Sequence, residues 1–171
     1  MLIRREFADW TLVGGIDPGT RIIGGAIIAV RGQALQLVEM RSWRIVGETI
    51  EERIAFVGSS VEEWLPPGVK LTGVENGYVG QNPRAALTIA MARGAVLRAV
   101  QRAGGRARLV DPSEARKSVG AARWGDKRKD AKVRVQRAVK LLLNLKREPT
   151  EDEADACTAG VWAANRVWSL D

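Results

Sequence analysis

The sequence contains no histidine and a single cysteine, Cys157. Without histidine, the chain offers no Ser-His-Asp or Cys-His catalytic pair and no histidine-ligated zinc site. A single cysteine excludes an intramolecular disulfide and a cysteine-rich zinc site, and we interpret Cys157 as a small packing residue. If the protein is an enzyme, its acid–base chemistry must come from carboxylates, lysine, tyrosine or a metal-bound water.

Long apolar runs are also absent from the 171 residues. No stretch approaches the roughly 18 consecutive apolar residues that a membrane helix needs. Residues 1–9 mix basic and acidic side chains and lack the apolar core of a signal peptide, so we expect a cytoplasmic protein. The length suits one compact core and no linker divides the chain, which predicts a single domain over residues 1–171.

Acidic residues are scarce in one long segment, although the whole chain carries a net charge of only +7 at pH 7. Between residues 93 and 147 there are 17 Lys and Arg against 4 Asp and Glu, a local charge of +13. A basic block beside acidic segments indicates a polyanionic partner, and we expect nucleic acid. A well-solvated helical surface is the structural alternative.

Hydrophobic periodicity predicts five strands and five helices in the order βββαβαβααα. The first three strands are joined by tight turns and are expected to be antiparallel, whereas the later two follow helices and are expected to add in parallel. The predicted fold class is therefore α/β, with a five-stranded mixed sheet flanked by helices. The strands cover residues 10–17, 22–30, 34–43, 69–75 and 107–110, and the helices cover residues 49–65, 82–103, 112–119, 127–145 and 150 to about 167.

Four acidic residues stand out because each falls at the end or the start of a predicted element. Asp17 closes the first strand, in Gly-Ile-Asp-Pro-Gly-Thr, and Glu75 closes the fourth, in Gly-Val-Glu-Asn. Asp152 and Asp155 lie three residues apart in the first turns of the last helix and share one helical face. Open α/β sheets bind ligands outside the carboxyl ends of their strands, so this position favours a site.

Clustered carboxylates repel one another unless a cation neutralises them. Oxygen ligands suit hard divalent cations, which indicates magnesium or manganese. Two such ions about 4 Å apart can activate water and stabilise the leaving oxygen of a phosphodiester. Each acid alone also has a structural explanation: Asp17 as a turn residue, and Asp152 and Asp155 as acids favoured at a helix start. We interpret Glu151 and Glu153 as capping or solvated residues.

Four blocks of sequence resemble a known family, the RuvC Holliday junction resolvases of the RNase H-like, retroviral-integrase superfamily. The resemblance runs from residue 13 to about residue 163, nearly the whole chain. Gly-Ile-Asp-Pro-Gly alone is weakly diagnostic, but the second block at its distance from the fourth is specific. The blocks are Gly15 to Arg21 with Gly24-Gly25 soon after, Val74 to Tyr78 followed by Asn82 to Gly94, Pro112 to Gly120, and Asp152-x-x-Asp155-Ala156.

The resemblance implies an RNase H-like fold and a metal-dependent endonuclease that resolves Holliday junctions in DNA recombination and repair. It implies that Asp17, Glu75, Asp152 and Asp155 are catalytic and hold two Mg²⁺ or Mn²⁺ ions per active site. It also implies a homodimer, because symmetric nicks in two opposed strands need two symmetric sites. The sequence gives no support for a membrane partner or for a branch-migration helicase.

The resemblance further assigns contacts with DNA. Tyr78 matches an aromatic residue that family members insert near the junction centre, where stacking on an unpaired base contributes roughly 1–3 kcal/mol; a packed loop aromatic is the alternative. The other expected contacts give salt-dependent affinity that carries little sequence information. They are Asn82, Arg84, Arg116, Lys117, Lys127, Arg128, Lys129 and Lys132.

The chain departs from the family pattern in ways that bear on substrate selectivity. About nine residues precede the first strand, Arg116 stands where lysine is common, and Asp152 stands where some members have histidine. A divergent, phage-type member that also cuts flaps or Y-forks is therefore an alternative. A less specific RNase H-like nuclease, including one acting on RNA, and a non-catalytic junction-binding protein are others. An actin-like or sugar-kinase nucleotide binder needs a second similar domain, which 171 residues cannot supply.

Overall fold

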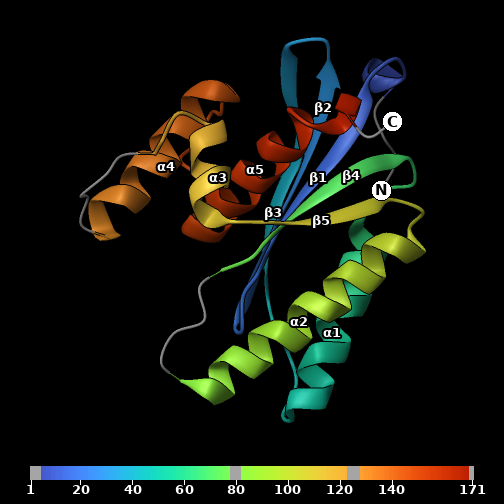
Figure 1. Ribbon diagram of the computed structural model, residues 1–171. Coiled ribbons are helices and arrows are strands. Elements are labelled where there is room, and N and C mark those ends of the chain that lie inside the picture. Colours follow the sequence, from blue (N-terminus) through green and yellow to red (C-terminus); the bar gives the residue numbers. More distant parts are fainter. Residues whose placement is uncertain (1–4, 78–81, 123–127, 170–171) are drawn as a thin grey trace.

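A computed structural model describes residues 5–77, 82–122 and 128–169 (Figure 1). Strands and helices follow the predicted order, and a short 3-10 helix precedes the first strand (Arg5–Phe7) and follows the last helix (Val167–Ser169). Among the described helices, none has the length and apolarity needed to span a lipid bilayer. The strands are β1 (Thr11–Pro18), β2 (Ile22–Arg31), β3 (Ala34–Arg44), β4 (Val69–Glu75) and β5 (Arg106–Val110), and the helices are α1 (Ile50–Trp64), α2 (Pro83–Arg102), α3 (Pro112–Ser118), α4 (Arg128–Leu142) and α5 (Glu151–Ala164).

The five strands form one sheet in the order β3-β2-β1-β4-β5. β1 pairs antiparallel with β2, and β2 with β3. β4 pairs in parallel with β1, and β5 in parallel with β4. The predicted mixed sheet with three leading antiparallel strands is confirmed. Because β1 and β4 are parallel neighbours, their carboxyl ends meet at the same end of the sheet.

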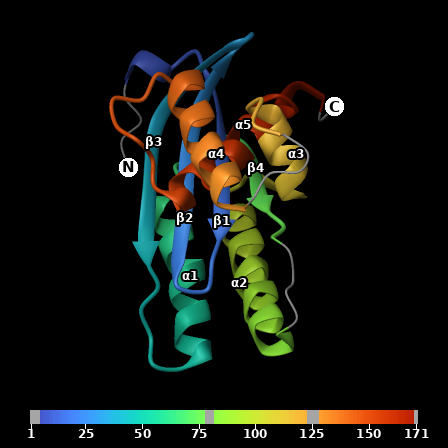
Figure 2. The same ribbon diagram turned by 90° about the vertical axis from the view of Figure 1, so that its left-hand side faces the viewer.

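Two apolar clusters, one on each face of the sheet, hold the helices in place (Figures 1 and 2). α5 packs across β1, β2 and β4, and α3 and α4 pack beside it. α1 and α2 pack against each other on the opposite face. β1 is buried on both faces: Val13 belongs to the α5 side, and Leu12 and Ile16 belong to the side of α1 and α2. The central strands therefore read as nearly continuous apolar runs.

Glycines on three adjacent strands allow the backbone of α5 to approach the sheet directly. We call Gly15, Gly24 and Gly73 the glycine track, because a Cβ atom added to any of them would overlap a carbonyl oxygen of α5. No side chain fits at these distances, so the track determines how close α5 lies to β2, β1 and β4. The distances from the added Cβ to the carbonyl oxygen are 2.0 Å for Gly15 and Ala156, 2.0 Å for Gly24 and Asp152, and 2.3 Å for Gly73 and Ala159.

The last two helices each end about three residues before the predicted position. α4 ends at Leu142, because Asn144 adopts a left-handed backbone with φ of 50°. The Leu145 N–H then donates to the Lys140 carbonyl at 2.9 Å, as in a Schellman motif. The apolar spacing continues through Leu145, which is why periodicity predicted a longer helix. α5 ends at Ala164, and Asn165 caps it before the chain tightens into the second 3-10 helix.

Replacing Gly15 by alanine is expected to lower the free energy of unfolding by about 1–3 kcal/mol, the usual cost of overpacking a core. The new methyl group has to displace the α5 backbone. Gly94→Ala is the matched control, because nothing lies within 4 Å of a Cβ atom there. Alanine inside the exposed face of α2 should raise stability by roughly 0.5–1 kcal/mol. Urea unfolding followed by tryptophan fluorescence measures both variants, and a Gly15→Ala protein as stable as the parent would contradict the close approach.

Candidate functional site

Asp17 is the penultimate residue of β1 and lies on the face of the sheet that α5 covers. Side chains alternate along a strand, so Asp17 shares this face with Gly15 of the glycine track. Its partner on β2 is Gly24, which has no side chain to cover the carboxylate. Asp17 therefore faces the first turns of α5, and it interacts electrostatically with Asp155 and Asp152. Asp-Pro-Gly on its own suggests a turn residue, but Asp17 is a paired residue of β1.

Glu75 ends β4, the strand next to β1, and its side chain is buried with 8 % of its surface exposed. The Asn76 N–H donates to the Val110 carbonyl at 2.8 Å, so pairing with β5 continues beyond Glu75 and fixes the end of the strand. Glu75 interacts electrostatically with Asp17 and Asp155. Two neighbouring strands thus present carboxylates to the same region.

The start of α5 supplies the other two acids, and hydrogen bonds hold it in position. Thr150 caps the helix in a capping box with Glu153, as predicted from the sequence. The Glu153 carboxylate also accepts two hydrogen bonds of 2.7 Å from the Arg147 guanidinium. Glu153 is therefore a buried structural residue. With this turn fixed, Asp155 and Asp152 both interact electrostatically with Asp17 at the end of β1.

Burial raises the pKa of all four carboxyl groups, and repulsion within the cluster adds to this for Asp17, Glu75 and Asp155. Burial, then the charges of Asp155 and Asp152, raise the pKa of Asp17 to about 7. Burial, then the charges of Asp17 and Asp155, raise the pKa of Glu75 to about 8. Asp17 keeps some exposed surface, yet loss of water around it is still the largest cause. Burial is also the largest cause of the raised pKa of Asp152 and of Asp155. The structure thus brings the four predicted residues into one electrostatic unit.

The donor atoms of this cluster match a divalent cation. All four side chains offer carboxylate oxygens, which are the ligands that hard cations prefer. Within the residues that the structure describes, no three acidic, cysteine or histidine side chains converge tightly enough to enclose an ion. Direct ligation therefore requires these side chains to turn toward a bound ion. The donor chemistry and the need for charge compensation fit a metal, and the role of each residue as a ligand stays a prediction.

Comparison with known proteins identifies the family. The model of the family described as crossover junction endodeoxyribonuclease RuvC matches residues 13–162. The chain belongs to the RuvC family. This is a family of metal-dependent nucleases. Two relatives with the same description, from Dichelobacter nodosus and Acinetobacter baylyi, are 32 % and 30 % identical over 160 residues, which cover 91 % and 93 % of this chain and 86 % of each relative.

Solved RuvC structures share the fold of this chain. Thermus thermophilus RuvC superposes with a TM-score of 0.76 at 24 % identity, covering 92 % of this chain and 96 % of that one. A second structure, of T. thermophilus RuvC in complex with a Holliday junction substrate, gives a TM-score of 0.76 at 22 % identity, covering 93 % and 96 %. The RNase H-like fold and the RuvC family, both expected from the sequence, are confirmed.

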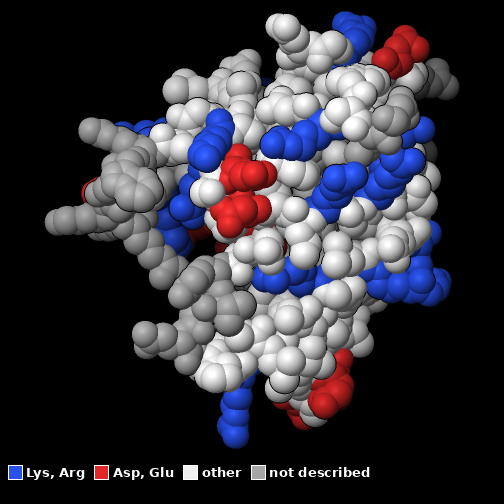
Figure 3. Space-filling view, in the orientation of Figure 1, with Lys and Arg blue, Asp and Glu red and all other residues white. Residues whose placement is uncertain are grey.

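Two of the basic residues singled out in this RuvC family member face the carboxylates. Arg116 of α3 lowers the pKa of Glu75 and of Asp155 against the effect of burial. Lys132 of α4 does the same for Asp17, Asp152 and Asp155. Figure 3 shows acidic side chains at the edge of a hollow in the surface, with basic side chains on either side. These two cations therefore belong to the electrostatic unit itself.

The other predicted DNA contacts have more varied surroundings. Asn82 caps α2, and its side chain accepts from the backbone N–H groups of Arg84 and Ala85, so it has a structural role of its own. Arg84 and Lys117 are exposed. Tyr78 and Lys127 lie outside the described residues, as do the side chains of Arg128 and Lys129.

Arg93 is a neighbour of the site that the sequence did not single out. It lies in the middle of α2, donates to the Gly77 carbonyl at 3.3 Å and interacts electrostatically with Glu75. Burial lowers the pKa of Arg93, and the charge of Glu75 offsets part of that change. Its position within the second sequence block, 18 residues after Glu75, was the only signal in the sequence.

Metal-free protein is expected to lose stability as the pH rises from about 4 to about 8. The ordinary pKa values are 3.8 for Asp17 and 4.5 for Glu75, and folding raises them to about 7 and about 8. The folded state therefore binds protons more tightly, so its advantage is complete below the ordinary values and is lost as the pH passes the raised ones. Unfolding by urea in EDTA at a series of pH values measures this slope.

A variant pair assigns that slope to the cluster. Glu75→Gln should flatten it, because one of the strongly shifted groups no longer titrates. Glu63→Gln is the control, since Glu63 is an exposed residue of α1, and it should keep the slope. Stability that increases between pH 5 and pH 9 in EDTA would contradict the raised pKa values, as judged by the linkage relation.

Proposed function

We propose that this protein resolves four-way DNA junctions by making paired, symmetric nicks through metal-dependent hydrolysis of phosphodiester bonds. The observation that carries the proposal is the electrostatic interaction among Asp17, Glu75, Asp152 and Asp155, which β1, β4 and α5 supply in a member of the RuvC family. One relative of known structure, T. thermophilus RuvC, was solved with a Holliday junction substrate. That protein supports the choice of substrate class for this one.

We infer that the four carboxylates hold two divalent ions, Mg²⁺ or Mn²⁺. When bound, such ions supply the Lewis acidity for in-line attack of water on phosphorus. In the absence of metal, the raised pKa values of Asp17 and Glu75 mean that these groups retain protons near neutral pH. Metal binding then has to displace those protons, so affinity for the metal should increase with pH.

The surrounding cations have a separate task. Arg116 and Lys132 lie beside the carboxylates, where they would bind the DNA phosphates on either side of the cut and screen their charge from the acids. Tyr78 is proposed to stack on an unpaired base at the junction centre. A homodimer would place two such sites on opposed strands, as two-fold symmetric cutting requires.

Cleavage of three substrates tests the proposal: a four-way junction, a Y-fork and a linear duplex of matched sequence, each with Mg²⁺, with Mn²⁺ and with EDTA. Paired nicks in the junction, abolished by EDTA, are expected. Asp152→Asn should slow cleavage by at least about 100-fold, the scale for loss of a group that stabilises transition-state charge. Glu63→Gln is again the matched control and should cut at the parental rate.

Two other outcomes correspond to the alternatives. Cutting of all three substrates with metal would identify a broader nuclease that uses the same site, so the junction assignment would be wrong. Tight junction binding without cleavage in either metal would identify a non-catalytic junction-binding protein. A monomer by light scattering under cleavage conditions would contradict the paired symmetric mechanism.

A further inference from the structure

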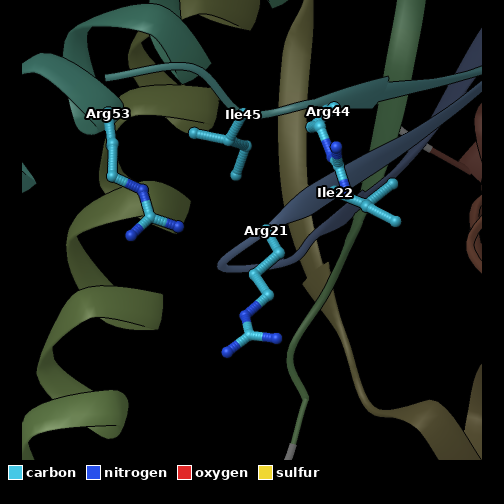
Figure 4. Close-up of a pocket in the computed structure, with 5 residues that line it drawn as sticks. All are labelled: Arg21, Ile22, Arg44, Ile45 and Arg53. Carbon is cyan, nitrogen blue, oxygen red and sulfur yellow. The ribbon is translucent and has the colours of Figure 1, made fainter. Parts of the chain in front are cut away.

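A second basic feature lies at the same end of the sheet as the carboxylates but outside their cluster. A pocket of about 570 Å³ opens between the connection from β1 to β2, the end of β3 and the first turns of α1 (Figure 4). Three of its five lining residues are arginines, and each comes from a different one of these elements. We call it the arginine pocket, and its lining consists of Arg21, Ile22, Arg44, Ile45 and Arg53.

Backbone and side-chain hydrogen bonds hold the three arginines in a fixed relation. Arg21 accepts a hydrogen bond at its carbonyl from the Ile45 N–H at 2.8 Å. Arg44 lies opposite Ile22 in the ladder between β2 and β3. The Arg53 guanidinium donates to the Thr20 carbonyl and so ties α1 to the β1–β2 connection. The pocket is therefore a built feature of the fold, although Arg21 and Arg44 are exposed at their tips.

Ion pairs with described acidic residues do not neutralise the three arginines of this pocket. Among the ion pairs formed by the described part of the chain, none includes Arg21, Arg44 or Arg53. Glu52 lies beside Arg53 in the first turn of α1, but its carboxylate accepts from the backbone N–H groups of Glu48 and Thr49. Three guanidinium groups around one opening favour an anion.

The side chains that line the arginine pocket favour a phosphodiester as the bound anion. Guanidinium groups bind phosphate oxygens through paired, charge-assisted hydrogen bonds. Among the described residues that line the pocket, none is aromatic and so none offers a base a stacking surface, and the apolar ones are Ile22 and Ile45. Recognition would therefore concern the sugar–phosphate backbone and would be independent of sequence.

The position of the pocket relates it to the site of cutting. Arg44 ends β3, which is two strands away from β1 and Asp17. Neighbouring strands lie about 4.8 Å apart, so the lateral separation is roughly 10 Å. A DNA strand rises about 3.4 Å per nucleotide along the helix axis, and its backbone also winds around that axis, so this span covers at most about three nucleotides.

We propose that the arginine pocket binds a backbone phosphate of the DNA strand within about three nucleotides of the bond that is cut, a limit set by the strand and nucleotide spacings. The inference rests on the proposed function, because it takes the carboxylate cluster as the site of cutting. It adds an anchor on the β1–β2 hairpin, separate from Arg116 and Lys132. Asp17 and Arg21 lie on the same hairpin, four residues apart, so this anchor would set the strand relative to the carboxylates.

Binding of a labelled four-way junction in EDTA, measured by fluorescence anisotropy across a range of salt concentrations, tests the anchor without cleavage. Arg21→Gln and Arg44→Gln should each raise the Kd by roughly five- to tenfold at low salt, the scale of one lost charged hydrogen bond. The double variant should lower the slope of log K against log salt by about 1, as one lost phosphate contact predicts. Arg53 is left intact because it also holds the hairpin.

Arg98→Gln is the matched control, since Arg98 is an exposed arginine of α2 and does not line the pocket. It should leave the Kd and the salt slope unchanged. The pocket assignment is wrong if the double variant binds as the parent does, or if Arg98→Gln weakens binding as much. If the parent protein does not bind the junction at all, the proposed function and the anchor are both wrong. If the double variant has the parental Kd and cleaves the junction normally, only the anchor is wrong.

Discussion

The contact between α5 and the glycine track is the constraint on which the rest of the structure depends. Because Gly15, Gly24 and Gly73 carry no side chains, the backbone of α5 touches three strands at once. This contact forms the centre of one apolar core, and it also sets the height of the first turn of α5 above the strand ends. A helix displaced by one side chain would still close a core, but it would carry Asp152 and Asp155 away from β1 and β4. The packing of the core and the proposed chemistry therefore both require α5 to lie this close to the sheet.

The same contact creates an electrostatic cost that packing must offset. Bringing α5 close places Asp155 beside Asp17 and Glu75 in a region where burial already disfavours charge. The capping box and the bond between Arg147 and Glu153 hold the helix start against this repulsion. A divalent cation would remove the cost and convert repulsion into ligation. The free energy that destabilises the empty cluster is thus the same free energy that favours metal binding.

Local patterns in the sequence were sufficient for the strands, for the order of the elements and for the cap at Thr150, because each depends on neighbours along the chain. They also placed the four carboxylates at two strand ends and a helix start, as the structure does, while their role as metal ligands stays a prediction. They failed at Asn144, where a left-handed residue ends a helix whose apolar spacing continues. Arg93 and the arginine pocket were not foreseen, because their significance arises only when separate elements fold together.

The two groups of cations around the carboxylates also limit where selectivity for branched DNA can originate. Arg116 and Lys132 on one side, and the arginine pocket on the other, would hold phosphates, and every DNA strand offers phosphates at similar spacing. These contacts therefore add affinity for a linear duplex as well as for a junction. Discrimination must come from features that a duplex cannot satisfy, such as an unpaired base for Tyr78 and two opposed strands for the two sites of a dimer. If each site binds its strand only moderately, simultaneous engagement of both provides the difference, because the second contact is intramolecular once the first has formed.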